Sequence, residues 1–260
     1  MFKNANNRLQ IASLLFLFGL MACDDGVSPS ASVSVSLSVA VDQSAPAAVG
    51  DFATGGLAAD ITEDDGTHTL VITRVAMVLR EVELERLSTP DCPDGVEDDD
   101  ACEEFEAGPF LLELPTDGSV TTTVSVDADP DVYDEVEFEI HKPEDESADD
   151  LAFLSQHPDF EGVSIRVEGT FDGESFVFLQ DLNAEQEMPL VPPLEVTEDT
   201  GAVNLTLTVD VRSWFRDGAG ALIDPREANK GEAFEAVVAD NIEASLDLFE
   251  DDDRDGESDD

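Results

Sequence analysis

Basic residues are scarce in this sequence of 260 residues. Twelve lysines and arginines stand against 62 aspartates and glutamates, and the formal charge is −50. A chain with this charge repels the phosphates of nucleic acids and anionic lipid headgroups, so we expect no nucleic acid partner. Hydrophobic residues still make up 42% of the chain. That share is too large for a disordered acidic polymer and predicts a folded domain.

Histidine and the larger aromatic residues are also few. The three histidines, His68, His141 and His157, are isolated from one another and lack the spacing of a zinc site. The sequence has no Gly-x-Ser-x-Gly elbow, P-loop or dinucleotide fingerprint. No catalytic residue is therefore predicted, and a single Trp and a single Tyr argue against a carbohydrate-binding module.

The N-terminus has the pattern of a bacterial export signal. Lys3 and Arg8 precede an uncharged stretch over residues 11–22 that is too short to span a bilayer. The stretch ends in Leu20-Met21-Ala22-Cys23, which looks like a lipobox. We therefore predict a signal peptide over residues 1–22, with Cys23 diacylated and anchored on the extracytoplasmic side of the cell envelope. Asp24 resembles the inner-membrane retention signal of enteric bacteria, but that rule does not transfer between phyla, so either membrane stays open.

The two remaining cysteines, Cys92 and Cys102, bracket a segment of Pro, Asp, Gly and Glu. In an oxidising compartment this spacing favours a local disulfide, which would contribute roughly 2.5–3 kcal/mol by restricting the unfolded chain. A metal-binding pair or a redox dithiol is the alternative. Neither a Cys-x-x-Cys spacing nor a neighbouring histidine supports it.

Most of the chain alternates between apolar and polar residues, which is typical of half-buried strands. The spacing predicts strands over 31–41, 110–114, 120–126, 132–140, 163–167, 176–179 and 203–211, and one bent strand or two strands over 68–87. Residues 42–67 are expected to form a loop, Asp172-Gly173 a hairpin turn, and residues around 149–156 a short helix.

The period changes after Trp214. Apolar residues from Phe234 to Phe249 fall on one helical stripe, and Asn229 with Glu232 resembles a capping box. The sequence thus predicts a mainly β fold, an antiparallel β-sandwich with one C-terminal amphipathic helix at about 231–249. The expected organisation is a signal peptide (1–22), a tether (23–30), a single β-sandwich domain (31–249) and an acidic tail (250–260).

The acidic tail has part of the spacing of a calcium loop. Asp251, Asp253, Asp255 and Gly256 match positions 1, 3, 5 and 6, and Asp259 matches position 9. The pattern resembles the start of an EF-hand, dockerin or thrombospondin type-3 loop. The sequence ends two residues before position 12, where an EF-hand places a bidentate Glu, so we expect weak calcium binding. A solvated acidic tail without a metal is the alternative.

Three stretches, 72–86, 110–114 and 209–256, resemble uncharacterised predicted lipoproteins of environmental bacteria. The last stretch includes Val-Asp-Val-Arg-Ser-Trp-Phe-Arg, Asn-Ile-Glu-Ala-Ser-Leu and Asp-Arg-Asp-Gly. The resemblance implies a transthyretin-like or immunoglobulin-like sandwich that bacteria export. It implies no activity and no catalytic residue.

Three interpretations of function follow. The first is a lipid-anchored, extracytoplasmic binding or structural module of the bacterial envelope with weak calcium binding, whose partner, an envelope protein or a glycan, stays open. The second is a carboxylate- or metal-dependent hydrolase with a site near residues 141–161, where His141 and His157 occur beside Glu144 and Asp159. The third is that the acidity serves solubility at high salt, as in halophile proteins, because salt screens self-repulsion.

The lipid anchor predicts a change in location. Replacing the acylated thiol by a hydroxyl in Cys23→Ser leaves no site for the lipid, so the protein should move from the membrane fraction to the soluble fraction. Fractionation of cells that express either form, followed by immunoblotting, measures this. If the variant stayed in the membrane fraction, the lipobox prediction would be wrong.

Overall fold

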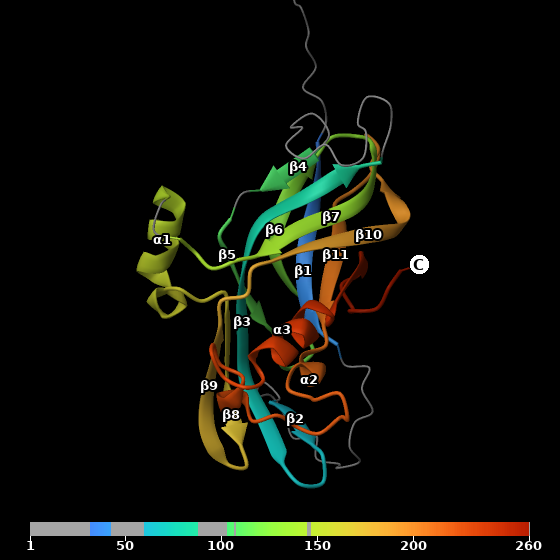
Figure 1. The fold of residues 1–260 in the computed structure, drawn as a ribbon. Coiled ribbons are helices and arrows are strands. Elements are labelled where there is room, and N and C mark those ends of the chain that lie inside the picture. The colour runs from blue at the N-terminus through green and yellow to red at the C-terminus, as the bar shows by residue number, and fades with distance from the viewer. Residues whose placement is uncertain (1–31, 43–59, 88–102, 107, 145–146, 260) are drawn as a thin grey trace, which may run out of the picture. The chain divides into compact units, whose positions relative to one another are not determined.

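Two β-sheets form the framework of the fold (Figure 1). The computed structural model describes residues 32–42, 60–87, 103–106, 108–144 and 147–259. The strands are β1 (Val33–Val41), β2 (Ile61–Asp64), β3 (Thr69–Arg86), β4 (Glu103–Glu106), β5 (Phe110–Leu114), β6 (Thr121–Ala128), β7 (Val132–Ile140), β8 (Ile165–Phe171), β9 (Glu174–Gln180), β10 (Ala184–Glu195), β11 (Val203–Val209) and β12 (Leu246–Glu250). The prediction of a mainly β fold is confirmed.

The helical segments are short. They are α1 (Ala148–Gln156), α2 (Val211–Trp214), α3 (Glu235–Glu243) and the 3-10 turns η1 (Pro158–Phe160) and η2 (Pro225–Glu227). Within the described residues, no helix is long and apolar enough to cross a membrane.

The first sheet has the strand order β12-β11-β1-β6, and the second has β10-β7-β3-β8-β9, with β2, β4 and β5 also paired to β3. β1 pairs with β11 in parallel, which differs from the expected antiparallel arrangement. Parallel neighbours need a long connection, and the more than 160 residues between these two strands provide one. Apolar side chains from both sheets, including Leu37, Leu207, Met77 and Phe138, belong to one buried cluster.

β3 is the long strand that organises the second sheet. Its core-facing residues are Leu70 and Ile72, then Val75, Met77 and Leu79, then Val82 and Leu84, so the alternation changes phase twice. Each change coincides with a register shift, between Ile72 and Arg74 and between Arg80 and Val82. An extra residue in one strand has this effect, because side chains alternate with a period of two.

The two shifts place Arg74, Ala76, Val78 and Arg80 on the sheet face opposite the main core. The first shift also brings β8 very close to β3, since a Cβ on Gly169 would lie 2.0 Å from the carbonyl oxygen of Val71. Glycine is therefore required at position 169. α1 and η1 cover the face that carries Ala76 and Val78.

The predicted C-terminal helix is wrong over part of its length. α3 ends at Glu243, and residues 246–250 form β12, which pairs with β11. Leu246 and Phe249 fit a helical stripe, but Leu246 and Leu248 also fit the alternation of a strand, and pairing with β11 satisfies the backbone groups of this segment. Residues 61–64, expected in a loop, pair with β3 as β2.

A loop containing η2 runs along the outer edge of β9. Arg226 pairs with Glu174 (2.8 Å), the side chain of Asn229 accepts a hydrogen bond from the backbone N–H of Leu179 (2.9 Å), and Lys230 pairs with Asp181. These contacts cover an edge strand that would otherwise offer unpaired backbone groups to another chain.

Glu63 on β2 holds two arginines from a distant part of the chain. Arg212 Nη1 lies 2.8 Å from Glu63 Oε1, and Arg216 Nη2 pairs with Glu63 Oε2. The Glu63 side chain is only 14% exposed. The pairs therefore tie β2 to α2 and the segment after it.

Removing this charge should destabilise the fold. Glu63→Gln leaves two partly buried guanidinium groups without a carboxylate, so we expect a loss of about 2–3 kcal/mol in the free energy of unfolding. Glu174→Gln is the matched control, because it removes a 76% exposed partner of Arg226 and should cost at most about 0.5 kcal/mol. Urea unfolding followed by circular dichroism measures both. Equal losses would show that Glu63 acts as an ordinary surface charge.

Candidate functional site

The predicted calcium loop begins where β12 ends. Three of its carboxylates converge: the ligand atoms of Asp251, Asp253 and Asp255 all lie within 4.8 Å of one another. Asp251 is fully buried, whereas Asp253 and Asp255 are exposed. The group thus consists of one fixed carboxylate in the protein and two at its surface.

Three hydrogen bonds hold the buried carboxylate of Asp251. Thr206 Oγ1 donates to its Oδ2 (2.8 Å), the N–H of Asp255 donates to Oδ1 (3.0 Å) and the N–H of Gly256 donates to Oδ2 (3.1 Å). These donors offset the cost of burying a charge. The two backbone bonds also curl the chain around Asp251. The turn needs a left-handed backbone at Gly256 (φ 82°), which glycine adopts without strain.

A network of hydrogen-bonded polar side chains connects this loop to the first sheet. Asn204 donates to the carbonyl oxygen of Asp251 (2.8 Å) and to Thr206 Oγ1 (3.0 Å). Ser38 Oγ donates to Asn204 Oδ1 (2.6 Å) and lies 2.9 Å from Thr122 Oγ1. This hydrogen-bond network crosses β11, β1 and β6, so the position of Asp251 depends on three strands.

Sequence reasoning did not identify Ser38, Asn204 and Thr206. A signal was present, because the outward positions of β1 and β11 carry Ser, Thr and Asn, whereas those of β7 carry Glu135, Glu137 and Glu139. Small neutral polar residues on a strand face of so acidic a chain indicate that the face is covered.

Asp259 does not join the three carboxylates. Its Oδ2 accepts a hydrogen bond from the backbone N–H of Asp252 (2.6 Å), and its own N–H donates to the carbonyl oxygen of Glu250 (3.0 Å). It closes the loop back onto the end of β12. The other predicted site residues, Cys23, Cys92 and Cys102, lie outside the described residues.

The three histidines lie in separate places. His141 Nδ1 is 2.7 Å from the carbonyl oxygen of Lys142, and its Nε2 is 4.0 Å from Glu144. His157 ends α1, and its ring packs on Phe153 with 4.8 Å between centroids. His68 pairs with Asp172 (2.7 Å), which raises the pKa of His68. The described contacts do not bring His141 and His157 together.

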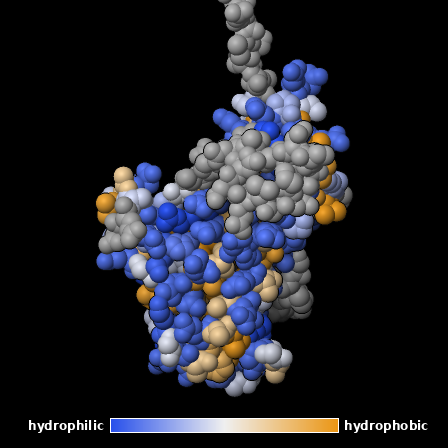
Figure 2. Space-filling view, turned by 45° about the horizontal axis from the view of Figure 1, so that its top comes forward, coloured by the Kyte–Doolittle hydropathy of each residue, from blue (hydrophilic) through white to orange (hydrophobic). Residues whose placement is uncertain are grey.

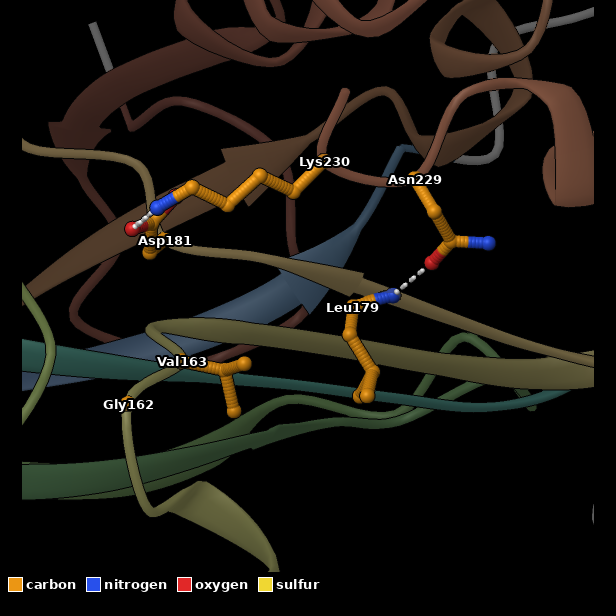
Figure 3. A pocket seen from close by; sticks show the side chains of 6 residues that line it. All are labelled: Gly162, Val163, Leu179, Asp181, Asn229 and Lys230. Atoms are coloured by element: carbon orange, nitrogen blue, oxygen red, sulfur yellow. Dashed lines mark hydrogen bonds and ion pairs between the residues drawn. The ribbon is translucent and has the colours of Figure 1, made fainter. Parts of the chain in front are cut away.

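A shallow hollow of about 280 Å³ lies between the start of β8 and the loop along β9 (Figure 3). Val163 and Leu179 form its apolar part, while Asp181, Asn229 and Lys230 lie at its polar side. Lys230 points to Asp181 and Asn229 to the backbone of Leu179, so these polar groups are already engaged with the protein. The hollow contains no histidine.

A second acidic group lies on the outward face of β3, β7 and β10. Ligand atoms of Glu85, Glu135 and Glu137 fall within 4.8 Å of one another. In the strand register, Glu137 lies opposite Glu83 on one side and Glu187 on the other. Partial burial, together with the charges of Glu185, Glu83, Glu85 and Glu187, raises the pKa of Glu137 from 4.5 to about 7.

Hydrophilic residues dominate one face of the molecule. Figure 2 shows a face covered mostly by hydrophilic residues, with small hydrophobic patches between them. Carboxylates placed directly opposite each other on neighbouring strands repel. The second sheet therefore carries electrostatic strain near Glu137 at neutral pH.

This strain predicts a pH dependence of stability. The pKa of Glu137 is higher in the folded state than in the unfolded state, so its contribution is fully present below about pH 4.5 and is lost as the pH rises through about 7. Glu137→Gln should therefore be more stable than the wild type at pH 8, by about 1 kcal/mol after allowance for solvent screening, and equal to it at about pH 4.

Urea unfolding at the two pH values measures this difference. Glu195→Gln is the control, because Glu195 lies on β10 opposite Val132 and its loss changes the net charge equally. A pH-independent gain, or the same gain in the control, would refute the assignment to Glu137.

Comparisons of the chain with models of protein families, with curated proteins and with solved structures give no match. Its function is therefore inferred from its own residues.

Proposed function

We propose that the protein is a lipid-anchored, extracytoplasmic module of the bacterial envelope, built as a β-sandwich with a short helix near its C-terminus, and that calcium bound in the C-terminal loop fastens this loop to the sandwich. The role is structural or ligand-binding rather than catalytic. The observation that carries the calcium proposal is the convergence of Asp251, Asp253 and Asp255 around a buried carboxylate.

Calcium suits this group chemically. It prefers six to eight oxygen ligands, mainly carboxylates, carbonyls and water, in flexible geometry. Asp251, Asp253 and Asp255 supply three carboxylates, and water can supply the rest. Because two of the three are exposed, the ion stays partly hydrated, and we expect the millimolar affinity of extracellular calcium modules.

Calcium would also relieve repulsion. Without a cation, three carboxylates within 4.8 Å oppose the closure of the loop, although the hydrogen bonds to Asp251 favour it. A divalent cation turns this repulsion into attraction. The gain passes to the first sheet through Thr206 and Asn204.

Distance supports placing the module close to the membrane. β1 begins at Val33, ten residues after the predicted lipid attachment at Cys23. Ten residues reach at most about 35 Å when fully extended. An anchored domain would therefore stay near the headgroups, and its negative charge would keep it from lying on an anionic surface.

Thermal unfolding in CaCl₂ and in NaCl at matched ionic strength tests the calcium site. Matched salts screen surface charge equally, so a specific site adds a saturable shift. At a free calcium concentration of about ten times the dissociation constant, the gain should be about 1.4 kcal/mol, or roughly 3–5 °C in Tm.

The double variant Asp253→Asn/Asp255→Asn should lose this shift. Glu232→Gln/Asp240→Asn removes two exposed charges around α3, at the other end of β12, and should keep it. Equal Tm values in the two salts for the wild type, or a shift retained by the Asp253/Asp255 variant, would contradict the proposal.

A further inference from the structure

The connection between β7 and β8 leaves the second sheet and returns to it at one residue of β3. The backbone N–H of His141 donates to the carbonyl oxygen of Val78 (3.3 Å), and the N–H of Val78 donates to the carbonyl oxygen of Ser164 (2.8 Å). Residues 147–163 of this connection contain α1 and η1 and are called the lid below. Because the flanking residues meet at Val78, the lid could move while β7 and β8 stay in register.

The underside of the lid is a small apolar cluster, separate from the main core. It joins lid residues to Ala76 and Val78 of β3 and Leu111 of β5; the lid residues are Phe153, Leu154, Phe160 and Val163. Phe160 is fully buried and Phe153 is 7% exposed. The cluster is smaller than the main core, but its two buried Phe side chains keep the lid closed most of the time.

Ion pairs supply the other part of the attachment. Asp150 of the lid lies 3.2 Å from Arg80, and Asp159 lies 3.4 Å from Arg74 and 3.5 Å from Arg166. These are three of only nine arginines in the chain. The lid itself contains four acidic residues and no lysine or arginine. Attraction between opposite charges therefore supplies part of the lid's attachment, although most charges in this protein repel each other.

The two attachments differ in exposure. The side chain of Asp150 is 2% exposed, and Ser147 Oγ also donates to it (2.7 Å). The side chain of Asp159 is 39% exposed. Its two arginines also pair with Glu168, and Arg74 pairs with Glu113 of β5 at 2.5 Å as well. Salt screens exposed pairs much more than buried ones. Salt therefore weakens the ion pairs of Asp159 at the η1 end of the lid, whereas the buried ion pair between Asp150 and Arg80 persists.

We propose that residues 147–163 form an electrostatically latched lid whose opening becomes more frequent as ionic strength rises, and that its opening uncovers a sheet face of apolar and arginine side chains. The rest of the fold responds in the opposite direction. Salt screens the repulsion among carboxylates such as Glu83, Glu137 and Glu187, which tightens the sheets while the lid loosens.

Hydrogen–deuterium exchange of the full chain at low and at molar NaCl tests whether salt loosens the lid while it stabilises the sheets. Amides of α1 and η1 should exchange about fivefold faster at molar salt, since two exposed pairs weaken. Amides of β7, which carries Glu137, should exchange more slowly under the same conditions. Peptides from both regions come from one sample, so effects of salt on the intrinsic exchange chemistry cancel in the comparison.

Asp159→Asn should give fast exchange in the lid already at low salt and should remove its salt dependence. Glu161→Gln changes the same charge two residues away, at a side chain that has no ion pair among the described residues, and should behave like the wild type. The proposal is overturned if lid and β7 amides slow together as salt rises, or if the Asp159 variant keeps the wild-type response.

Discussion

The repulsion among carboxylates is the constraint on which the rest of this structure depends. With 62 acidic and 12 basic residues, the chain cannot give most carboxylates a cationic partner. Those that are not simply exposed must accept hydrogen bonds. Asp65 is an example: the backbone N–H groups of Leu222, His68 and Thr67 lower its pKa to about 2. Asp251, held by a hydroxyl and two backbone N–H groups, is the buried version of the same solution.

Because arginines are so few, their positions show where attraction is needed. Several of them fix a segment outside the sheets onto the sheets. Glu63 of β2 holds Arg212 and Arg216, the loop along β9 uses Arg226, and the lid uses Arg74, Arg80 and Arg166. Arg74 of β3 also pairs with Glu113 of β5 and Glu168 of β8, so ion pairs link some neighbouring strands as well. Where Glu137 faces Glu83, backbone hydrogen bonds hold the strands together despite the repulsion.

The alternation of residues predicted most of the strands but not β2, β4, β10 or β12, and it did not predict which strands pair. β1, β5 and β7 lie within a few residues of the predicted ranges, because one face of each meets the core. The parallel pairing of β1 with β11 could not be predicted, since it depends on contacts far apart in the chain. The prediction for residues 246–249 was wrong for a different reason. A short apolar run fits both the helical and the strand period, and only pairing with the free edge of β11 selects the strand.

The candidate site shows the same division between local and distant information. Spacing alone identified Asp251, Asp253 and Asp255, because a loop that curls around one carboxylate is determined by neighbouring residues. It could not show that Asp251 is buried, since Thr206, Asn204 and Ser38 come from other strands. That burial changes the chemistry of the group. A solvated acidic tail would reorganise around any cation, whereas a fixed carboxylate lets Asp253 and Asp255 adjust to an ion whose first ligand is already in place.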